Sequence, residues 1–541
     1  MRKIFISTLV LASLLILIAC PLALKSLKYD LYFTSSYQDQ KHYGVEIRDT
    51  IRKILSTYDR AAHYPEIKIV NPYDKSLFPR DIASPTFTWK DSTPDSKSWL
   101  IIISFKNNGH SIYVLSGKNE WTPEDKNTWE IIKANSRESS ADVTVLGISG
   151  CGEWKITAKG GISISTSEDK VESPILFQQI PLPFAYARRH PKLSRWCIGD
   201  VSSYEKARII LKNLPVCGFC HSLSRDGKTF GMDIDYKRDK GAYVLAPVMK
   251  YMALTRDNII SWNDIPVTKA LPNMGLFSKI SPDGKYVIST INEKPFMAII
   301  DDLYFSQLFF PVTGYLAYYS REDKSFHLLP GADDPDYIHT SPAWSPDGKT
   351  IVFSRAGLDR KLIDVMGNSR LLKIEPDVRI DDLNKKYRIQ FDLCRIPFNN
   401  GKGGTPEPLA GACSNGKSNY FPRFSPDGKW IVFNQSDTGL VAQPGSELYI
   451  IPAEGGIARK MKCNTDLFNS WHSWSPNGKW VIFTSKVNTP YTQLFITHID
   501  ENGNDSPPVL LSRFSSPKYA SILPEFANIK PDTIQGMMFF H

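Results

Sequence analysis

Two thiols and an imidazole lie close together near the middle of the chain. Cys217, Cys220 and His221 form a Cys-x-x-Cys-His sequence, which is the pattern of covalent haem attachment in c-type cytochromes. At this spacing the two thiols form thioethers with the haem vinyl groups, and the imidazole binds iron from the same turn. One interpretation of these residues is therefore a haem c site in a redox protein.

Other interpretations of the same three residues stay open. The two thiols could form a local disulfide, bind zinc with two further ligands elsewhere, or be buried without a ligand. The motif also runs directly into a turn at Asp226-Gly227, which leaves little room for the helical shell of a small cytochrome. Eight Cys are present, and setting Cys20 aside leaves an odd number, so the thiols cannot all form disulfides.

The first residues predict export from the cytoplasm. Arg2 and Lys3 are followed by an almost uninterrupted apolar run, Ile4–Leu24, as in a signal peptide. The sequence Leu-Ile-Ala-Cys at 17–20 resembles a bacterial lipobox, which implies cleavage before Cys20 and lipidation of its thiol. The alternative is an uncleaved membrane anchor, because about 20 apolar residues span a bilayer. In both cases we expect an envelope protein that is anchored in the inner or outer membrane and faces the periplasm.

Composition favours a β-rich protein of more than one domain. A chain of 541 residues is too long for one hydrophobic core, and its 12% aromatic residues suit half-buried pleated surfaces. The formal charge of +9 is spread along the chain, without a basic run interleaved with aromatics. Nucleic acid is therefore not expected as a partner.

The first part of the chain predicts a tether followed by a small β-sandwich. Residues 25–65 read as a tether with a short helix, because apolar residues recur at helical spacing over Val45–Tyr58. Residues 66–180 alternate between short apolar strands and polar turns, which indicates a sandwich. The sequence Pro-Thr-Phe-Thr-Trp at 85–89 resembles an opening strand of Ig-like or fibronectin type III-like modules. Residues 181–215, which begin Pro-Leu-Pro, read as a linker.

Five copies of a Ser-Pro-Asp-Gly-Lys repeat dominate the second part of the chain. The first copy has Arg225 in the place of Pro, and the last has Asn477 in the place of Asp. Asp-Gly and Asn-Gly supply the positive φ angles of a tight hairpin turn, and Pro presets the entry to the turn. Alternating apolar strands flank the turns, as at 430–433. The turn residues are Asp226 and Gly227, Asp283 and Gly284, Asp347 and Gly348, Asp427 and Gly428, and Asn477 and Gly478.

These repeats resemble the WD-like repeats of TolB-type β-propellers of the bacterial envelope. The resemblance covers about 216–515 and implies an all-β fold class, with a β-propeller over 216–541. Each sheet of a propeller buries its faces against its neighbours, so the blades stack in a ring. Five blades are visible in the sequence. A sixth is expected from the C-terminal stretch 522–538 together with sequence near 190–215, which would remove the exposed strand edges.

The chain contains no contiguous motif that names a reaction. It has no Gly-x-Ser-x-Gly, no His-Glu-x-x-His and no phosphate-binding glycine loop, so we assign no catalytic residue and leave metal content open. His472 reads as a hydrogen-bonded blade residue. The favoured function is a binding or scaffold protein of the periplasm, whose partner is an envelope protein, a glycan or a peptide. The alternatives are the haem redox protein and a propeller hydrolase or lyase, whose site would be assembled from several blades.

Overall fold

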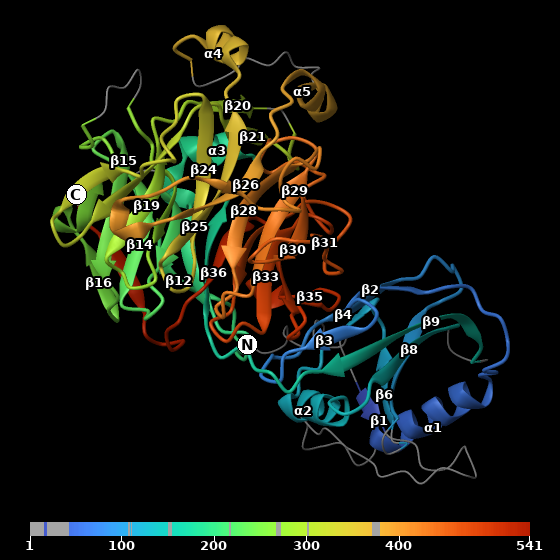
Figure 1. The fold of residues 1–541 in the computed structure, drawn as a ribbon. Coiled ribbons are helices and arrows are strands. Elements are labelled where there is room, and N and C mark those ends of the chain that lie inside the picture. Colours follow the sequence, from blue (N-terminus) through green and yellow to red (C-terminus); the bar gives the residue numbers. More distant parts are fainter. Residues whose placement is uncertain are drawn as a thin grey trace, which may run out of the picture. The chain divides into compact units, whose positions relative to one another are not determined.

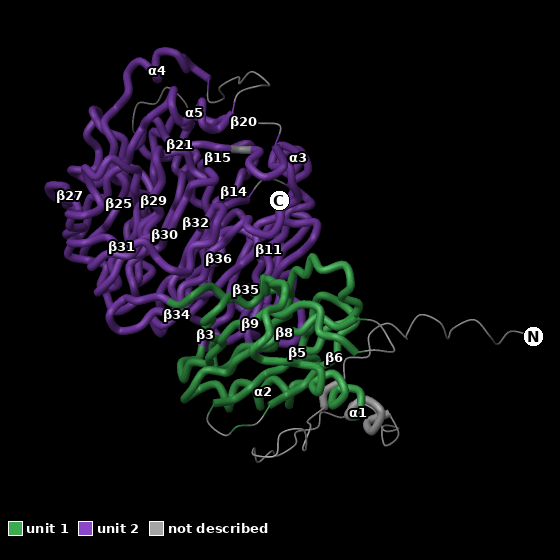
Figure 2. Tube along the Cα trace, turned by 90° about the vertical axis from the view of Figure 1, so that its right-hand side faces the viewer, with its two compact units in different colours: residues 1–170, 506–512 green, residues 171–505, 513–541 purple. Residues whose placement is uncertain are grey.

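The computed structural model of the chain is mostly β-sheet (Figure 1). It describes residues 16–18, 43–106, 109, 111–149, 154–215, 218–266, 272–299, 302–369 and 379–540. Cys20 and Cys217 lie outside these residues, so the predictions made for them rest on the sequence. The chain divides into two compact units, residues 1–170 with 506–512 and residues 171–505 with 513–541 (Figure 2). Within the described part of the chain, no helix combines the length and apolar character needed to cross a membrane.

The smaller unit contains two sheets in the region where the sequence predicts a sandwich. The sheets have the strand orders β1-β6-β5-β8-β9-β3 and β2-β4-β7, and β3 pairs with β9 in parallel. The likeness to fibronectin type III modules stays a prediction. The strands are β1 (Ile16–Ile18), β2 (Lys68–Asn71), β3 (Ser76–Phe78), β4 (Phe87–Lys90), β5 (Ser98–Phe105), β6 (Ser111–Ser116), β7 (Glu120–Trp121), β8 (Ala141–Ile148) and β9 (Ile156–Thr166), with β35 (Val509–Leu510) in the late segment.

Two helices accompany these sheets. Helix α1 (Tyr43–Ser56) coincides with the helix expected from the sequence, and its apolar face packs on the larger sheet. Helix α2 (Lys126–Asn135) is absent from the sequence prediction. It begins after Asp125, whose carboxylate accepts hydrogen bonds from two backbone amides of the first turn, and it buries Trp129. Because α2 is short and flanked by strands, its capping residue is its clearest sequence signal.

The larger unit consists of sheets that repeat one antiparallel strand order. Five are four-stranded, with the orders β36-β10-β11-β12, β13-β14-β15-β17, β18-β19-β22-β23, β24-β25-β26-β27 and β28-β29-β30-β31, and the sixth contains β32-β33-β34. The strands are β10 (Ile175–Ile180), β11 (Arg195–Gly199), β12 (Arg208–Leu211), β13 (Gly218–Leu223), β14 (Thr229–Tyr236), β15 (Asp239–Pro247), β17 (Ile259–Ser261), β18 (Leu276–Ile280), β19 (Tyr286–Ile291), β22 (Tyr315–Ser320), β23 (Ser325–Leu328), β24 (Tyr337–Trp344), β25 (Thr350–Gly357), β26 (Asp392–Pro397), β27 (Glu407–Pro408), β28 (Ser418–Phe424), β29 (Trp430–Ser436), β30 (Glu447–Pro452), β31 (Arg459–Lys460), β32 (Asn469–Trp474), β33 (Trp480–Ser485), β34 (Gln493–His498) and β36 (Ala520–Phe526).

The innermost strands of the six sheets form a closed ring. Strand β13 contacts β18, β18 contacts β24, and the series continues through β28 and β32 to β36, which contacts β13 again. Each sheet therefore packs against two neighbours, and second strands such as β19, β29 and β33 are almost fully buried. This arrangement is that of a β-propeller. The β-propeller expected from the repeats is thus confirmed.

The blade that closes the ring is built from both ends of the larger unit. Its inner strand β36 comes from the C-terminal stretch, and β10, β11 and β12 come from residues 175–211. The sequence suggested a closing blade of this kind, but it placed β10 in the sandwich and read 181–215 as a linker. The division between the units instead falls between Lys170 and Val171. Strand β10 is buried along its whole length, its two glutamines included, so its sequence shows no alternation that would assign it to one of the neighbouring domains.

The repeat turns share one hydrogen-bond pattern. The Ser281 hydroxyl donates to the Asp283 carboxylate over 2.6 Å, and the same carboxylate oxygen accepts from the Lys285 amide over 3.1 Å. The glycine has a positive φ, +71° at Gly284, whereas the aspartate does not. The Gly284 amide also donates to the Ser281 carbonyl over 2.9 Å. The turn therefore needs one positive φ, at the glycine, where the sequence suggested more than one, and the Asp side chain adds its bonds to those of the backbone. Equivalent bonds occur at Asp226, Asp347, Asp427 and Asn477.

Two insertions and one extra strand pair lie outside the blades. The hairpin of β20 (Pro295–Ile299) and β21 (Gln307–Pro311) packs with helices α4 (Arg360–Met366) and α5 (Ile380–Lys386) in one apolar cluster (Figure 1). Strand β16 (Tyr251–Leu254) pairs in parallel with β37 (Gly536–Phe539). The shorter helices are α3 (Phe184–Arg189) and the 3-10 turns Pro191–Leu193, Arg256–Asn258, Asn399–Gly401 and Ser512–Phe514.

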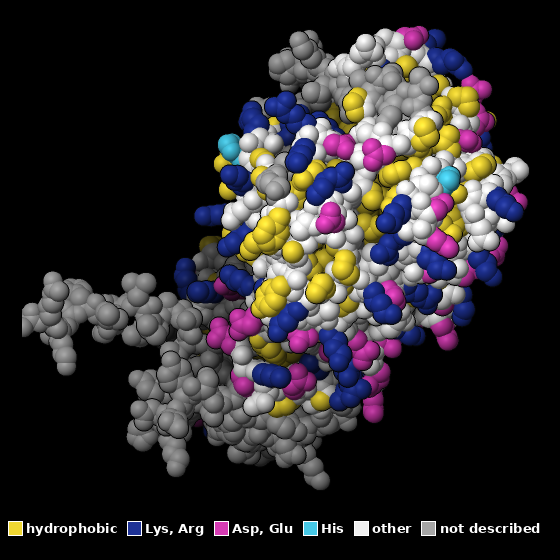
Figure 3. Space-filling view, turned by 90° about the vertical axis from the view of Figure 1, so that its left-hand side faces the viewer, with side chains coloured by type: hydrophobic (Ala, Val, Ile, Leu, Met, Phe, Trp, Pro, Cys, Tyr) yellow, Lys and Arg dark blue, Asp and Glu magenta, His cyan; other side chains and the backbone are white. Residues whose placement is uncertain are grey.

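The parallel pair β16–β37 exposes apolar side chains at the edge of the propeller. Met249, Tyr251, Met538 and Phe540 are each about half exposed or more, between 48% and 68%. Figure 3 views this side of the molecule, where apolar side chains alternate with lysines and arginines. These four side chains belong to the outer surface of the propeller.

Candidate binding site on the propeller axis

The inner strands carry bulges that turn one side chain toward the ring axis. In five of them a residue other than glycine has a positive φ, which is uncommon and accompanies a shift in strand register. Cys220 occupies the matching place in β13, where the register also shifts. The five residues are Phe277, Ser341, Phe421, Trp471 and Leu523.

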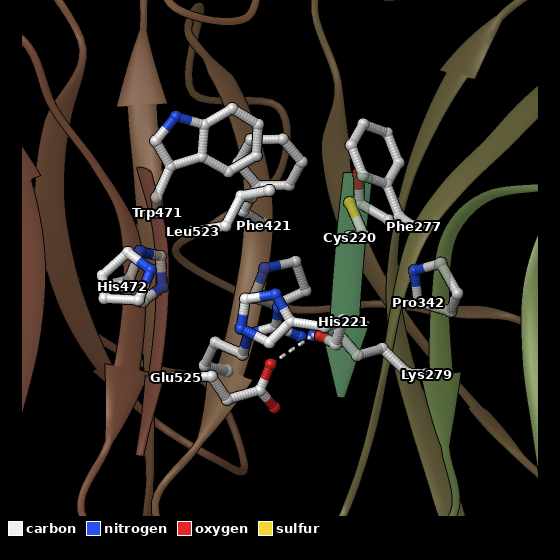
Figure 4. A pocket seen from close by; sticks show the side chains of 14 residues that line it. Cys220, His221, Phe277, Lys279, Pro342, Phe421, Trp471, His472, Leu523 and Glu525 are labelled. Atoms are coloured by element: carbon white, nitrogen blue, oxygen red, sulfur yellow. Dashed lines mark hydrogen bonds and ion pairs between the residues drawn. The ribbon is translucent and has the colours of Figure 1, made fainter. Parts of the chain in front are cut away.

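Apolar side chains close the axis at one end. Phe421 stacks on Trp471 with 4.9 Å between ring centroids, and it contacts Phe277 edge-on at 5.0 Å. Leu523 and Cys220 complete this apolar collar (Figure 4). The cavity beside the collar measures about 40 Å³, which holds a few water molecules.

The hairpin insertion covers the collar from outside. Phe309 of β21 stacks on Phe277 with 6.1 Å between centroids, and its backbone carbonyl accepts a hydrogen bond of 2.8 Å from the Val441 amide. The hairpin is therefore tied to two separate blades. An excursion that the sequence shows only as a long loop thus seals one end of the ring axis.

Three charged side chains lie on the axis beside the collar, namely Lys279, Arg423 and Glu525. We call them the charged triad. Lys279 donates a hydrogen bond to Glu525, with 3.1 Å between Nζ and Oε2 (Figure 4). Their side chains are 12% and 22% exposed. Burial acts to raise the pKa of Glu525, but Lys279 and Arg423 outweigh burial and hold that pKa below its usual value. Glu525 is therefore ionised at neutral pH.

A funnel opens from the charged triad to the repeat turns. Its volume is about 800 Å³, and Lys279 and Arg423 form its floor. Trp344 and Phe424 contribute apolar wall, together with the prolines of four repeats: Pro282, Pro346, Pro426 and Pro476. Because the collar closes the other end, the described residues form a blind funnel.

Arg225 reaches across the mouth of this funnel. Its guanidinium donates to the carbonyls of Pro346 and Pro426, over 3.1 and 3.3 Å. Its own carbonyl accepts from the Asn528 side chain over 2.6 Å. The one repeat that lacks proline thus places a cation where the other copies place a proline ring. No sequence rule for turns singles out this arginine, because its partners lie two and three blades away.

The histidines of the inner strands are structural. His221 and His472 occupy the same repeat position, one residue after Cys220 and Trp471. The His221 Nε2 donates to the Leu176 carbonyl at 3.4 Å, and the His472 Nε2 donates to the Val432 carbonyl at 3.0 Å. Each acceptor lies on the second strand of the preceding blade. Burial lowers the pKa of His221 to about 4 and that of His472 to about 3. Both therefore join neighbouring blades as neutral side chains, as expected for His472.

The described part of the Cys-x-x-Cys-His motif does not suit a haem. Cys220 and His221 are successive residues of strand β13 and are 6% and 2% exposed. The Cys220 thiol faces the apolar collar and the His221 imidazole faces β10, with a cavity of about 40 Å³ between collar and triad. A porphyrin needs far more room than this. The repeat itself carried the signal, because Cys-His-Ser-Leu-Ser at 220–224 matches Trp-His-Ser-Trp-Ser at 471–475.

We expect no covalent haem on the chain. Co-expression with cytochrome c maturation machinery should give a colourless protein without a Soret band, and the denatured chain should not stain for haem. A c-type cytochrome expressed in the same cells is the control for the machinery. Haem that stays with the chain on a denaturing gel would contradict this reading of β13.

Two further polar groups lie near the axis. Burial raises the pKa of the Asp233 carboxyl to about 8, so this side chain is mainly protonated at neutral pH. Burial also raises the pKa of the Cys220 thiol far above its usual value, and Asp233 adds to the shift. Neither group is therefore a charge or a thiolate nucleophile at neutral pH. Among the described residues, no cluster of three His, Cys, Asp or Glu side chains offers a metal site.

The charged triad and Arg225 are absent from the sequence predictions. Lys279 and Arg423 each stand two residues before a repeat serine, and Glu525 follows the bulge of β36 in the same way. In the other three inner strands this position holds Ser222, Ala343 and Ser473. Aligning the repeats would therefore have shown large charged residues where small ones are usual.

Comparisons with known proteins agree with the fold. No family model and no curated protein matches the chain. TolB from Acinetobacter baumannii shares 13% identity over 85% of this chain and 99% of its own, with a TM-score of 0.41. A putative TolB from Agrobacterium tumefaciens shares 15% over 66% and 99%, with 0.34. An oligogalacturonate lyase from Vibrio parahaemolyticus shares 13% over 57% and 70%, with 0.34. These values show distant similarity of fold to TolB β-propellers and carry no argument about function.

Proposed function

We propose that the protein is a non-catalytic binding protein of the cell envelope, whose propeller receives part of a partner in the axial funnel. The observation that carries this proposal is the funnel itself. It has a volume of about 800 Å³, lies within the closed ring of blades and is closed at its base. Pockets of this size, with apolar walls and few charged groups, are typical binding sites. The floor is charged and only partly exposed, so it can bind a charged group of the partner specifically.

The other parts of the chain would anchor the propeller in a membrane and connect it to that anchor. The N-terminal sequence, with its lipobox-like Cys20, supports an anchor in one of the envelope membranes. The smaller unit, with its fibronectin type III-like strand at 85–89, serves as a spacer or a second contact surface. The partner is an envelope protein, a glycan or a peptide.

Site-specific crosslinking tests the binding function. Lys530 is exposed and lines the funnel, so replacing it with p-benzoylphenylalanine places a photo-crosslinker at the mouth. In intact cells of the source organism, we expect a discrete crosslinked species after irradiation. The matched control puts the same residue at Ile457, which is 82% exposed on an outer strand connection, and we expect no such species there. Identical patterns at both positions, or none at either, would refute the proposal.

A further inference from the structure

We propose that the funnel binds an acidic peptide segment, whose carboxylate is held by Arg423 on the floor while Arg225 closes over it at the mouth. This inference rests on the proposed binding function and names its ligand class. It is carried by three observations, namely the charge of the floor, the bonding of Arg225 and the chemistry of the wall.

The floor of the funnel has an unbalanced positive charge. Lys279 and Arg423 are both cationic, and Glu525 is their one anionic neighbour in the charged triad. The other titratable groups that face them are neutral at pH 7, since Asp233 is mainly protonated and His221 is uncharged. A buried cation without a counter-charge is costly, so this floor favours an incoming anion.

Arg423 is the group that is available to that anion. Glu525 is hydrogen-bonded to Lys279, whereas the Arg423 guanidinium makes no hydrogen bond or close ion pair with any described residue. Burial lowers its pKa, but a guanidinium keeps its proton at neutral pH. Its planar donors match a carboxylate in the bidentate geometry that gives the strongest charge-assisted bonds.

Arg225 provides a second guanidinium that can change partners. Its present acceptors are the neutral carbonyls of Pro346 and Pro426, and its side chain is exposed. A carboxylate carries the opposite charge and can accept two parallel bonds from one guanidinium, which neutral carbonyls on separate residues do not offer. An acidic ligand would therefore draw Arg225 from the proline carbonyls, and the arginine would hold the ligand in the funnel.

The wall favours a peptide over a saccharide. It is formed largely by proline rings, with Ile280, Trp344 and Phe424, and these groups bury apolar side chains well. A saccharide would need many polar partners for its hydroxyl groups. Basic side chains outnumber acidic ones here, because Lys279, Arg423, Arg225 and Lys530 stand against two acids, Glu172 in the lining and Glu525 beside the floor. This excess attracts acidic segments electrostatically.

Calorimetric titration of the intact chain with defined peptides tests the proposal. The probe is a capped hexapeptide of alternating Ala and Glu at about 50 mM salt, and its Gln counterpart is the matched peptide. We expect the acidic peptide to bind and the Gln peptide not to bind. Arg423→Gln should weaken binding about 10- to 100-fold, because a hydrogen bond to a charged group contributes about 1.5–3 kcal/mol. Arg225→Gln, which removes the guanidinium but keeps the backbone N–H that donates to the Pro282 carbonyl, should weaken it about 5- to 10-fold.

Each remaining outcome decides against the proposal. Equal affinity of the wild-type chain and Arg423→Gln, or no heat with the acidic peptide, overturns it. So does Arg423-dependent binding of an oligogalacturonate with the same number of carboxylates, if it is tighter than that of the peptide. Arg395→Gln on an outer strand is the control for general charge loss. If crosslinking from Lys530 persists in Arg423→Gln, the binding function stands while the acidic-peptide inference fails.

Discussion

Glu525→Gln is expected to destabilise the propeller by about 2–4 kcal/mol. The substitution leaves Lys279 and Arg423 side by side on the axis without their counter-charge, and removing one partner of a buried pair typically costs about 3–5 kcal/mol. The lower range applies here because both side chains of the pair keep some exposure. Denaturant unfolding at pH 7, followed by tryptophan fluorescence, measures the change.

Lys279→Gln provides the matched comparison for this prediction. It leaves Arg423 facing Glu525, so the local charge balances and the expected loss is about 1–2 kcal/mol. Lys417→Gln, which breaks an exposed pair with Asp437 at 2.6 Å, should cost less than about 1 kcal/mol. If Lys279→Gln proves more damaging than Glu525→Gln, the idea of an unbalanced positive floor is wrong.

We expect the propeller to lose stability steeply as the pH falls from about 6.5 to about 4. His221 and His339 have pKa values lowered by burial to about 4, and His472 to about 3. In this window the unfolded chain binds protons that the folded chain cannot accept, so acid favours unfolding. Asp233 opposes this effect with one proton, because its raised pKa keeps it protonated in the folded state. The four groups together give a slope of about 2 kcal/mol per pH unit near pH 5.

Removing one histidine isolates this effect. His472→Gln retains a donor for the Val432 carbonyl and should reduce the slope of unfolding free energy near pH 5 by about 1.4 kcal/mol per pH unit. The exposed His190 is the control, and His190→Gln should leave the slope unchanged. Denaturation curves at pH 5, 6 and 7 for the three proteins are sufficient. An unchanged slope in His472→Gln would show that its imidazole is protonated in the folded state.

The local motif and the repeat give different interpretations of the same residues. Taken alone, Cys217, Cys220 and His221 have the spacing for covalent haem. Within the repeat, His221 is the counterpart of His472, and both imidazoles bond to the neighbouring blade. The position of His221 in the repeat therefore indicates a structural role, and this cannot be recognised from the Cys-x-x-Cys-His motif alone. Since Cys217 lies outside the described residues, the contribution of its thiol stays a prediction.

The closing blade shows where prediction from sequence reached its limit within the fold. The stretch that forms β36 and the region of β11 and β12 were expected to meet. Strand β10 was assigned to the preceding sandwich, because its residues are all buried, the two glutamines included, and show no alternation that would reveal its partner. Pairing of residues 175–180 with residues 520–526 depends on which edge is open after the other five blades have stacked.

The repeat, its five turns and the β-propeller could be predicted from the amino-acid sequence, because each turn is stabilised by bonds among five contiguous residues, such as 281–285. The candidate site could not be predicted in this way. Lys279, Arg423 and Glu525 lie on three blades and are more than 100 residues apart in the chain. Each of the three follows the bulge of its own inner strand. Their charges interact strongly only because closure of the ring brings them to one axis and removes most of the water around them.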